Sequence, residues 1–372
     1  MVDYSFVIPA YNNKKQLCNC LEALNKLLAV EKQTYEAIVI DDGSDDSLYR
    51  YIRDIPRQYR LHYKYLTRNS DSCRARTRNA GWQQARGSLI IFLDSDILVR
   101  PDYLSEINKC FHYGLNQLVV GMRIMIPEPV NSTEIIDGSV FEKYQFLQDD
   151  PRRWEIRHRI FNSFSHNMSC YKYPWLFVHS HNMVVPRYWL NKVNGFDEGF
   201  KGWGHEDIEL GYRLQQEELK IVLNTNMEVL HQYHSSPVRD DVDNGFMKDL
   251  ERNCRYFLDK HPALFDLPYT EALEVLKGNL IINPSVNNDR PRESNEITRH
   301  VVDYHSRNDF EKVKARIKKI CQLDKCEVII NDYTGESDLQ LWVQYLEKIK
   351  NVPSYFPVGK ILINNEPINQ IR

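Results

Sequence analysis

Asp94 and Asp96 stand one residue apart, directly after the apolar run 89–93. Two carboxylates with this spacing at the end of a strand can hold a hard divalent cation through oxygen ligands, and such a cation typically bridges the phosphates of a nucleotide. Taken alone, the pattern is also typical of a solvated loop. We interpret both aspartates as cation ligands because a second acidic pair occupies the same kind of position.

That second pair is Asp41 and Asp42, which follow the apolar run 37–40 in the sequence Asp-Asp-Gly-Ser. This composition also suits a turn or a helix N-cap. An acid at a strand end can accept hydrogen bonds from the base or ribose of a nucleotide, so we expect the pair to bind the nucleoside. Guanidinium groups that could contact the phosphates follow at Arg74, Arg76 and Arg78.

The elements that must position these groups alternate between strand and helix. Apolar runs at 6–8, 37–40 and 89–93 predict strands, and segment 15–28 and a segment near Tyr49 predict helices between them. Consecutive apolar residues are typical of parallel strands that are covered on both faces. We therefore expect a doubly wound α/β sheet with ligands at the carboxyl ends of its strands. The glycine-rich motifs of Rossmann dehydrogenases and P-loop enzymes are absent from the sequence, which excludes both classes.

The chain has 372 residues, enough for one large and one smaller domain. Its 48 Lys and Arg face 51 Asp and Glu, so it lacks the excess of positive charge that nucleic-acid binding needs. The N-terminus carries no signal-peptide pattern and no run is long enough to span a bilayer, so we expect a cytoplasmic protein with at most peripheral membrane contact. The eight cysteines are interpreted as free thiols, and no internal repeat is evident.

Four segments in this order resemble family 2 glycosyltransferases, which have the A-type glycosyltransferase fold. They are residues 6–12 (FVIPAYN), 38–44 (IVIDDGS), 75–81 (ARTRNAG) and 92–96 (FLDSD). The resemblance spans residues 4–105 and implies transfer of a sugar from a nucleotide donor, usually a UDP-sugar. It also implies that Asp94 and Asp96 hold Mn²⁺ or Mg²⁺, and that Pro9, Tyr11 and Ser95 belong to the donor site.

Residues 195–214 resemble the acceptor-side segment shared by β-1,4-galactosyltransferases and bacterial chondroitin-type polymerases. Trp203 offers a flat face for a sugar ring, and Gly204 allows close backbone approach. Glu206 and Asp207 are expected in the first turn of a helix, whose dipole favours ionised carboxylates. We assign Asp207 as general base and Glu206 as an orienting group. Both could instead be ordinary helix-start acids.

Histidines and an asparagine complete the set of candidates. In related enzymes a histidine at about this distance past the acidic pair completes the metal site, which favours His231 and leaves His234 as the second choice. Asn182 and its neighbour His181 could bind acceptor hydroxyls. The basic and aromatic cluster 151–159 is either a loop that closes over the donor or a charged surface helix.

The resulting hypothesis is a metal-dependent, inverting glycosyltransferase acting on a glycan or another hydroxyl or thiol acceptor, where inversion is implied by the family resemblance. Peptide or protein acceptors, a nucleotidyltransferase that makes nucleotide-sugars, and a catalytically silent carbohydrate-binding protein are alternatives. The catalytic domain is expected over residues 1–280, with a donor half at 1–105 and an acceptor half at 175–236. Residues 281–372 form a small C-terminal α/β domain that is an acceptor-recognition or oligomerisation module or a structural appendage. Its elements are predicted at 310–320 (helix), 327–330 (strand), 339–349 (helix) and 360–363 (strand).

Overall fold

The computed structural model describes residues 2–28, 33–144, 155, 157, 171–234, 245–278, 298–320, 326–332 and 361–364. The chain divides into two compact units. The first unit comprises residues 1–158 and 166–266, and the second comprises residues 159–165 and 267–372. The units thus part after residue 266, and the functional boundary at residue 280 stays a prediction.

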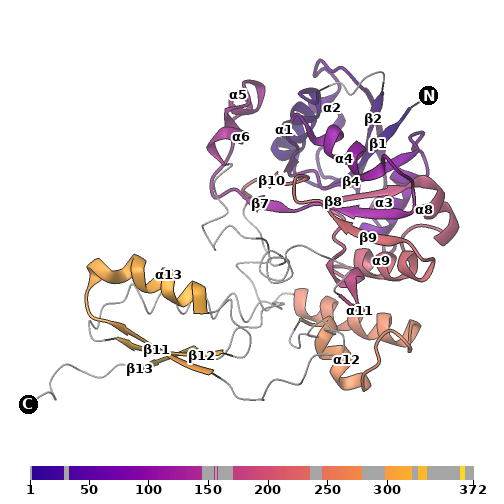
Figure 1. Ribbon diagram of the computed structural model, residues 1–372. Coiled ribbons are helices and arrows are strands. Elements are labelled where there is room, and N and C mark those ends of the chain that lie inside the picture. The colour runs from indigo at the N-terminus through magenta and orange to yellow at the C-terminus, as the bar shows by residue number, and fades with distance from the viewer. Residues whose placement is uncertain are drawn as a thin grey trace, which may run out of the picture. The chain divides into compact units, whose positions relative to one another are not determined.

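A seven-stranded sheet forms the centre of the first unit (Figure 1). In spatial order its strands are β3 (Arg60–Tyr65), β2 (Tyr35–Asp41), β1 (Tyr4–Ala10), β4 (Leu89–Leu93), β8 (Asn182–Pro186), β6 (Gln117–Val120) and β9 (Lys220–Leu223). Only β8 runs against its neighbours. The parallel sheet predicted for the first hundred residues is therefore confirmed, and the reversed strand makes the complete sheet mixed.

The chain places β2 and β3 on one side of β1 and then returns to place β4 on the other side. This reversal creates a topological switch point at the carboxyl ends of β1 and β4, where α/β sheets bind ligands. β4 pairs with β1 only as far as Val7, so Pro9 lies beyond the paired stretch on that side. Proline has no N–H to donate, and at this position the sheet needs none.

The helices of the donor half have apolar residues on one face or small residues where they pack closely against the sheet. These helices are α1 (Lys14–Asn25), α2 (Tyr49–Ile52) and α3 (Arg74–Trp82). Leu17, Leu21 and Leu24 recur on one face of α1 and are fully buried. A Cβ on Gly81 would lie 2.4 Å from Val7 Cγ1, so glycine there allows α3 to lie close against the sheet.

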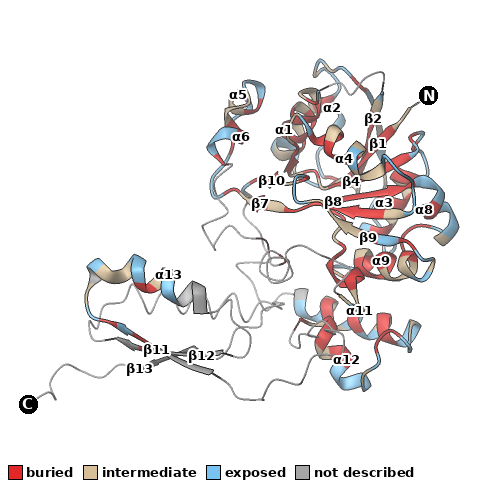
Figure 2. Cartoon of the chain, viewed as in Figure 1, coloured by how far each residue is buried: buried red, intermediate tan, exposed pale blue. Residues whose placement is uncertain are grey.

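β3 is the element of the donor half that sequence patterning misses. Its residues, Arg-Leu-His-Tyr-Lys-Tyr, are mostly polar and only partly buried, because β3 is the edge strand of the sheet. Figure 2 shows the contrast with β1 and β4, whose residues are buried almost throughout. An edge strand buries too little apolar surface to produce the run of apolar residues that marks a central strand.

A second, three-stranded sheet in the first unit has the order β5 (Ile97–Leu98), β10 (Val229–His231) and β7 (Arg123–Met125). β10 is the strand predicted near residue 229, and it pairs antiparallel with β5 directly after the Asp94–Asp96 segment. Among the described residues of this unit, the other helices are α4 (Tyr103–Phe111), α5 (Ser132–Ile136), α6 (Ser139–Lys143), η4 (Pro174–Phe177), α8 (Arg187–Val193), α9 (Glu206–Gln216) and α11 (Phe246–Lys260).

The second unit contains the helix α12 (Tyr269–Leu276) and a parallel sheet of β11 (Thr298–Tyr304), β12 (Cys326–Asp332) and β13 (Ile361–Asn364). α13 (Phe310–Ile320) connects β11 to β12, after the short η5 (Arg307–Asp309). The predicted helix 310–320 and the strands near 327–330 and 360–363 are confirmed, whereas the predicted helix 339–349 lies outside the described residues. Among the described helices of the chain, none combines the length and apolar character needed to cross a membrane.

Candidate active site

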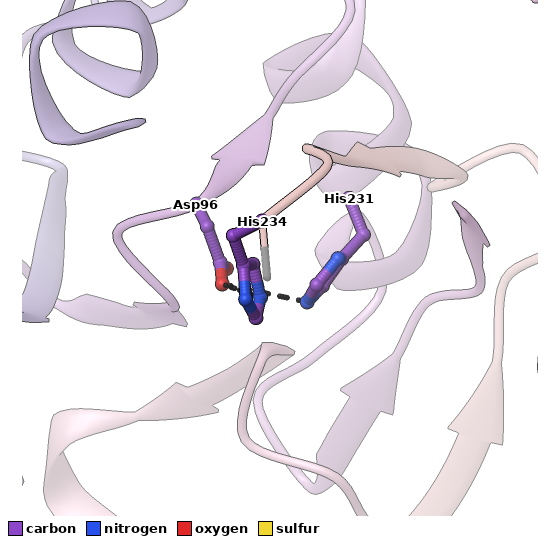
Figure 3. Close-up of side chains that lie close together, drawn as sticks. All are labelled: Asp96, His231 and His234. Carbon is purple, nitrogen blue, oxygen red and sulfur yellow. Dashed lines mark ion pairs between the residues drawn. The ribbon is translucent and has the colours of Figure 1, made fainter. Parts of the chain in front are cut away.

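Asp96, His231 and His234 form a cluster whose candidate ligand atoms all lie within 4.8 Å of one another (Figure 3). The antiparallel register of β5 and β10 pairs His231 with Ile97, the residue after Asp96. The Nε2 atoms of His231 and His234 lie 3.4 and 3.1 Å from Oδ2 of Asp96. Both histidines singled out in the sequence are therefore beside the second aspartate of the Asp-x-Asp segment.

The charge states of this cluster suit a divalent cation. Burial alone would raise the pKa of Asp96, but the two adjacent imidazoles hold the pKa of this carboxyl below its usual value. Burial lowers the pKa of His231 although Asp96 opposes this, so the imidazole is neutral at neutral pH. Oδ1 of Asp96 and Nδ1 of His231 are buried without a hydrogen-bond partner. An ionised carboxylate beside neutral imidazole is a donor set that a Mn²⁺-like ion can use.

Hydrogen bonds made by Gln232 and Asn19 hold the chain in place beside His231 and His234. The backbone N–H of Gln232 donates to the carbonyl of Asp96 at 2.9 Å. The side chain of Gln232 accepts from Asn19 Nδ2 at 2.9 Å and donates to the carbonyl of Gln16 at 3.0 Å, both on α1. Sequence reasoning missed Asn19 and Gln232, because nothing in the sequence shows that α1 lies beside β10.

Arg78, on α3, joins the donor side of the site to the acceptor side. Its Nη2 lies 3.1 Å from Oδ1 of Asp94, and its Nη1 lies 2.8 Å from Oε1 of Glu206. The guanidinium is only 3% exposed. The prediction that Arg78 contacts phosphate does not fit this geometry, because two carboxylates occupy its outer nitrogens. Arg74 is exposed and donates to the Gly202 carbonyl at 3.0 Å, so its phosphate role stays a prediction.

Glu206 and Asp207 occupy the first turn of α9, as predicted, but their environments differ. Ser180 donates to Oδ2 of Asp207 from its backbone N at 3.1 Å and from its Oγ at 3.3 Å. Burial would raise the pKa of Asp207, yet His179, Arg78 and these backbone bonds hold it below the ordinary value. Burial and the charge of Asp207 raise the pKa of Glu206 despite Arg78. Two adjacent carboxyls with pKa values pushed apart are an arrangement that suits acid–base chemistry.

A buried ionic cluster fixes the segment that holds Asp207. Glu155 faces Nδ1 of His179 at 3.4 Å and Nε2 of His181 at 3.9 Å, and Arg157 Nε binds the same carboxylate. Arg157 also donates to the carbonyl of Phe177 at 2.6 Å. Because Arg157 already supplies the positive charge that Glu155 faces, we interpret this group as an ion-pair cluster rather than a metal site. Glu155 and Arg157 belong to the predicted cluster 151–159, whose other residues lie outside the described residues.

The loop that carries Trp203 is held from below by α11. Asn253, buried on α11, has its Nδ2 within 2.9 to 3.0 Å of the carbonyls of Lys201, Trp203 and Gly204. Gly202 has φ +69°, and a Cβ there would lie 1.9 Å from Oδ2 of Asp249, so the loop needs glycine at this position. The Trp203 side chain stays 37% exposed. Asn253 has no signal in the sequence, because it lies about fifty residues beyond the loop it supports.

At the predicted nucleoside site, Asp41 and Asp42 play different roles. Asp41 is fully buried and accepts hydrogen bonds from Ser44 N at 2.9 Å and Tyr63 Oη at 2.6 Å. This corrects its assignment as a nucleoside ligand, since both of its oxygens shape the turn after β2. Asp42 lies 3.5 Å from Arg68 Nη1 and keeps a buried Oδ1 without a partner. Burial raises the pKa of Asp42 although Arg68 opposes this.

Residues after β1 complete this end of the site. Arg68 lies 4.0 Å above the ring of Tyr11, which is 43% exposed. Ser95, between Asp94 and Asp96 in the sequence, is buried and accepts a hydrogen bond from Asn13 Nδ2. Oδ1 of Asn13 is buried without a partner. Asn13 is a further site residue that the sequence motifs did not single out, although it directly follows the segment 6–12.

Asn182 does not fit its predicted role in acceptor binding. The side chain is fully buried in β8. Its Oδ1 accepts from Tyr103 Oη at 2.6 Å, and its Nδ2 donates to the carbonyls of Met122 and Met227 at 3.1 and 2.6 Å. Asn182 therefore ties β8 to α4 and to the segments that precede β7 and β10, and its hydrogen-bonding groups are already used within the protein.

Two family descriptions match the sequence. "Glycosyl transferase family 2" matches residues 5–193, just over half of the chain, and "N-terminal domain of galactosyltransferase" matches residues 159–235. The first match contains the Asp94–Asp96 segment, and the second contains Glu206, Asp207 and His231.

Individual relatives agree with the family match. Validoxylamine A glucosyltransferase of Streptomyces hygroscopicus subsp. limoneus is 30% identical over 268 residues, which cover 70% of this chain and 57% of that protein. Chondroitin synthase of Escherichia coli is 27% identical over 249 residues, which cover 63% of this chain and 34% of that protein. The chain thus spans less than two thirds of either relative. Staphylococcus aureus TarS 1–349, solved in complex with UDP-GlcNAc, has a TM-score of 0.48 at 15% identity, covering 75% of this chain and 71% of that one. From the family match and the mixed α/β sheet we conclude that the chain belongs to glycosyltransferase family 2 and has the A-type glycosyltransferase fold.

Proposed function

We propose that the protein is a metal-dependent, inverting glycosyltransferase that moves a sugar from a UDP-sugar to a hydroxyl of a glycan acceptor, with Asp207 as the general base. One observation carries the proposal. Arg78 contacts Asp94 at 3.1 Å and Glu206 at 2.8 Å, so the donor-side and acceptor-side carboxylates lie within the reach of one side chain. Asp94 and Glu206, 112 residues apart in the sequence, therefore lie beside each other, which supports a single site.

The metal would be held by Asp96, His231 and His234. A cluster with two imidazoles favours Mn²⁺ over Mg²⁺, because Mg²⁺ prefers oxygen ligands. When bound, a divalent cation supplies positive charge that stabilises the departing diphosphate. Asp94 was predicted as a ligand too. Arg78 engages only its Oδ1, so the other oxygen is available toward the donor.

The nucleoside would bind at the carboxyl ends of β1 and β2. Asp42 has a buried oxygen without a partner, which suits a hydrogen bond to the ribose or base. Tyr11 offers an exposed ring beside it, with Arg68 on its face. Asp41 supports this region indirectly by fixing the turn that carries Asp42.

The acceptor would lie on the exposed face of Trp203, next to the start of α9. Asp207 is ionised at neutral pH and can take the proton of the acceptor hydroxyl. The freed oxygen then attacks the anomeric carbon from the face opposite the diphosphate, the bond from this carbon to the diphosphate breaks, and UDP departs. Glu206, whose pKa is raised, orients the site through Arg78.

Asp207→Asn tests the assignment of the base. The variant should reduce transfer on the order of 10²- to 10⁴-fold and leave donor binding nearly unchanged, because the amide keeps the shape of the side chain but cannot accept the proton. Transfer is measured with a panel of UDP-sugars, Mn²⁺ and glycan acceptors, and donor binding is measured separately by calorimetry. Asp259→Asn, an exposed change of the same kind on α11, is the matched control. Normal transfer by Asp207→Asn would contradict the assignment of Asp207 as the base. Release of pyrophosphate from a nucleoside triphosphate and a sugar phosphate would indicate a nucleotidyltransferase instead.

A further inference from the structure

The two oxygens of the Asp207 carboxylate have different hydrogen-bond partners. Oδ2 accepts from the backbone N of Ser180 at 3.1 Å and from Oγ of Ser180 at 3.3 Å. Within the described part of the chain, Oδ1 accepts from a single donor, the backbone N of Ile208 at 2.9 Å. Each carboxylate oxygen can accept two hydrogen bonds. Oδ2 is therefore fully occupied by Ser180, whereas Oδ1 keeps one lone pair for a further proton.

Close packing between α9 and the segment before β8 brings Ser180 to Asp207. Gly211 lies four residues after Asp207 on α9, and therefore on the same face of this helix. A Cβ on Gly211 would lie 2.7 Å from Cγ2 of Val178, which is closer than such atoms approach. Glycine at this position lets the backbone of α9 come near the segment that carries Val178. Ser180, two residues further along that segment, can then reach Oδ2.

Buried charged groups hold the same segment in place. Arg157 donates from Nη1 to the carbonyl of Phe177 at 2.6 Å and from Nη2 to the carbonyl of Gly121 at 2.9 Å. Nδ1 of His179 lies 3.4 Å from Oε1 of Glu155. The chain just before Ser180, itself only 2% exposed, is thus fixed at two points. Ser180 is therefore in position before an acceptor binds, which is what an oriented base requires.

We infer that Ser180 is a positioning residue for transfer: its two donors occupy Oδ2 of Asp207, so that the acceptor proton goes to Oδ1. The inference rests on the proposed function, since it concerns the carboxylate assigned there as the base. In this step the acceptor O–H bond breaks and the proton binds to Oδ1. The acceptor oxygen keeps the electron pair of that bond and bonds to the anomeric carbon. The bond from this carbon to the diphosphate breaks, and its electron pair leaves with UDP.

The bonds from Ser180 also affect how the base responds to pH. Burial would raise the pKa of Asp207, and His179, Arg78 and the backbone bond from Ser180 hold it below the ordinary value. The charged or titratable groups that face Asp207 are Arg78 on α3, His179 before β8 and Glu206 on α9. A hydrogen bond to the ionised form of a carboxyl lowers its pKa. Loss of the Ser180 hydroxyl should therefore raise the pKa of the base, so that activity is lost at a higher pH during acidification.

Ser180→Ala in the full chain tests the inference, because it removes the hydroxyl and keeps the backbone N–H. The measurement is kcat/KM for the best glycan acceptor of the panel as a function of pH, with Mn²⁺ and saturating donor. The acid limb should move up by about one pH unit, as expected for loss of one hydrogen bond to a charged group, and kcat at neutral pH should fall about three- to tenfold. Ser180→Cys, which is close to serine in size but a weak donor, should move the limb in the same direction. The KM for the donor should stay unchanged in both variants.

The same acceptor with a thiol in place of its hydroxyl gives a readout that a merely structural role would not change. A thiol is largely ionised above about pH 8.5 and then needs no base. With this acceptor at about pH 9, Ser180→Ala should lower kcat by no more than about twofold. Ser5→Ala is the matched control, since it also removes a buried bond from a serine to a carboxylate, from Ser5 Oγ to Glu36 Oε1 at 2.7 Å, near the amino end of β1. This control should transfer sugar like the wild type.

The outcomes separate this inference from the proposed function. An acid limb that stays in place in both Ser180 variants would overturn the positioning role. Equal losses with the hydroxyl and thiol acceptors would also overturn it, since they indicate only a general disturbance of the site. If Asp207→Asn is inactive while Ser180→Ala keeps the wild-type pH profile, the positioning role is wrong and the proposed function stands. Normal transfer by Asp207→Asn would count against the base itself, and against this inference with it.

Discussion

Arg78 is the residue on which the geometry of the proposed site depends most. A guanidinium presents several donors in a fixed plane, so one side chain can hold Asp94 with Nη2 and Glu206 with Nη1. Lysine offers a single ammonium on a flexible stem and cannot reproduce two such contacts in fixed directions. Removing the partner of Glu206 is costly, because this carboxylate is buried.

Arg78→Lys should therefore lower kcat/KM for the donor by roughly ten- to a hundredfold, which corresponds to losing one charge-assisted hydrogen bond. Steady-state kinetics with varied UDP-sugar measures the change. Arg86→Lys is the matched control, since Arg86 is an exposed arginine four residues beyond the end of α3. Equal activity of both variants would show that the bridge between the carboxylates is dispensable.

At the scale of elements, the acceptor side depends on how α11 supports its neighbours. The Nδ2 of Asn253 lies within hydrogen-bond distance of three carbonyls of the Trp203 loop, and Asn253→Ala would remove these contacts, while the Lys201 carbonyl would keep its bond from Arg252. We expect the KM for the acceptor to rise by about tenfold while metal-dependent hydrolysis of the donor stays unchanged. The exposed Asn191→Ala, which loses one bond to the Arg187 carbonyl, is the control. A rise in donor KM instead of acceptor KM would contradict this role.

α9 is anchored to α11 by Glu209, which is fully buried. Its carboxylate lies 2.8 Å from Arg213 Nε, 3.0 Å from His261 Nε2 and 3.2 Å from Lys260 Nζ. Burial alone would raise the pKa of Glu209, but His261, Arg213 and Lys260 hold it below the ordinary value. Because the folded pKa is lowered, this carboxylate stabilises the fold above the ordinary pKa of glutamate, and the contribution is lost as the pH falls through the folded value.

Glu209→Gln should accordingly lower the free energy of unfolding at pH 7 by about 3 kcal/mol, because it removes the buried carboxylate that pairs with Arg213 and Lys260. The difference between variant and wild type should shrink as the pH is lowered from about 5 to 3, since the wild-type carboxylate then becomes protonated. Urea unfolding at several pH values measures both effects. Glu251→Gln, a change on the solvent side of α11, is the control and should alter the free energy of unfolding little. If the loss of stability in Glu209→Gln grew as the pH fell, the role assigned to the Glu209 carboxylate would be contradicted.

The sequence predicts the central strands of the sheet and the acidic residues at their ends. It does not predict the edge strand or the residues that support the site. The runs at 6–8, 37–40 and 89–93 predict β1, β2 and β4 because strands buried on both faces must be apolar throughout. Sequence patterns did not reveal β3 and β11, nor the supporting residues Asn13, Asn19, Gln232 and Asn253. These residues act on partners that are distant in sequence, so their types follow from packing that local patterns do not encode. Asp41 and Asn182 are the opposite case. Their positions in the sequence suggest ligand binding, but both side chains are buried and hydrogen-bonded within the protein.

At the scale of the whole molecule, the residues proposed to bind metal and nucleotide all lie in the first unit. This unit contains the cluster Asp96, His231 and His234 together with the carboxyl ends of β1 and β2. A ligand that binds the folded state stabilises the part it binds, and the size of the effect follows its concentration relative to Kd. Metal and nucleotide should therefore slow hydrogen exchange in the first unit.

Hydrogen exchange of the full chain measures the effects of metal and nucleotide in one experiment. With Mn²⁺ and UDP together, amides of β5 and β10 should exchange more slowly than with either alone, because the cation links the cluster to the diphosphate. At 100 times Kd the stabilisation is about 2.7 kcal/mol, or roughly a hundredfold slower exchange where opening is limited by that unit. Amides of β11 and β12 should not respond to Mn²⁺, since the cluster Asp96, His231 and His234 lies in the first unit. Asp96→Asn should abolish the Mn²⁺ effect in the first unit while UDP alone still protects β2, whereas a Mn²⁺ response that survives this substitution would place the cation elsewhere.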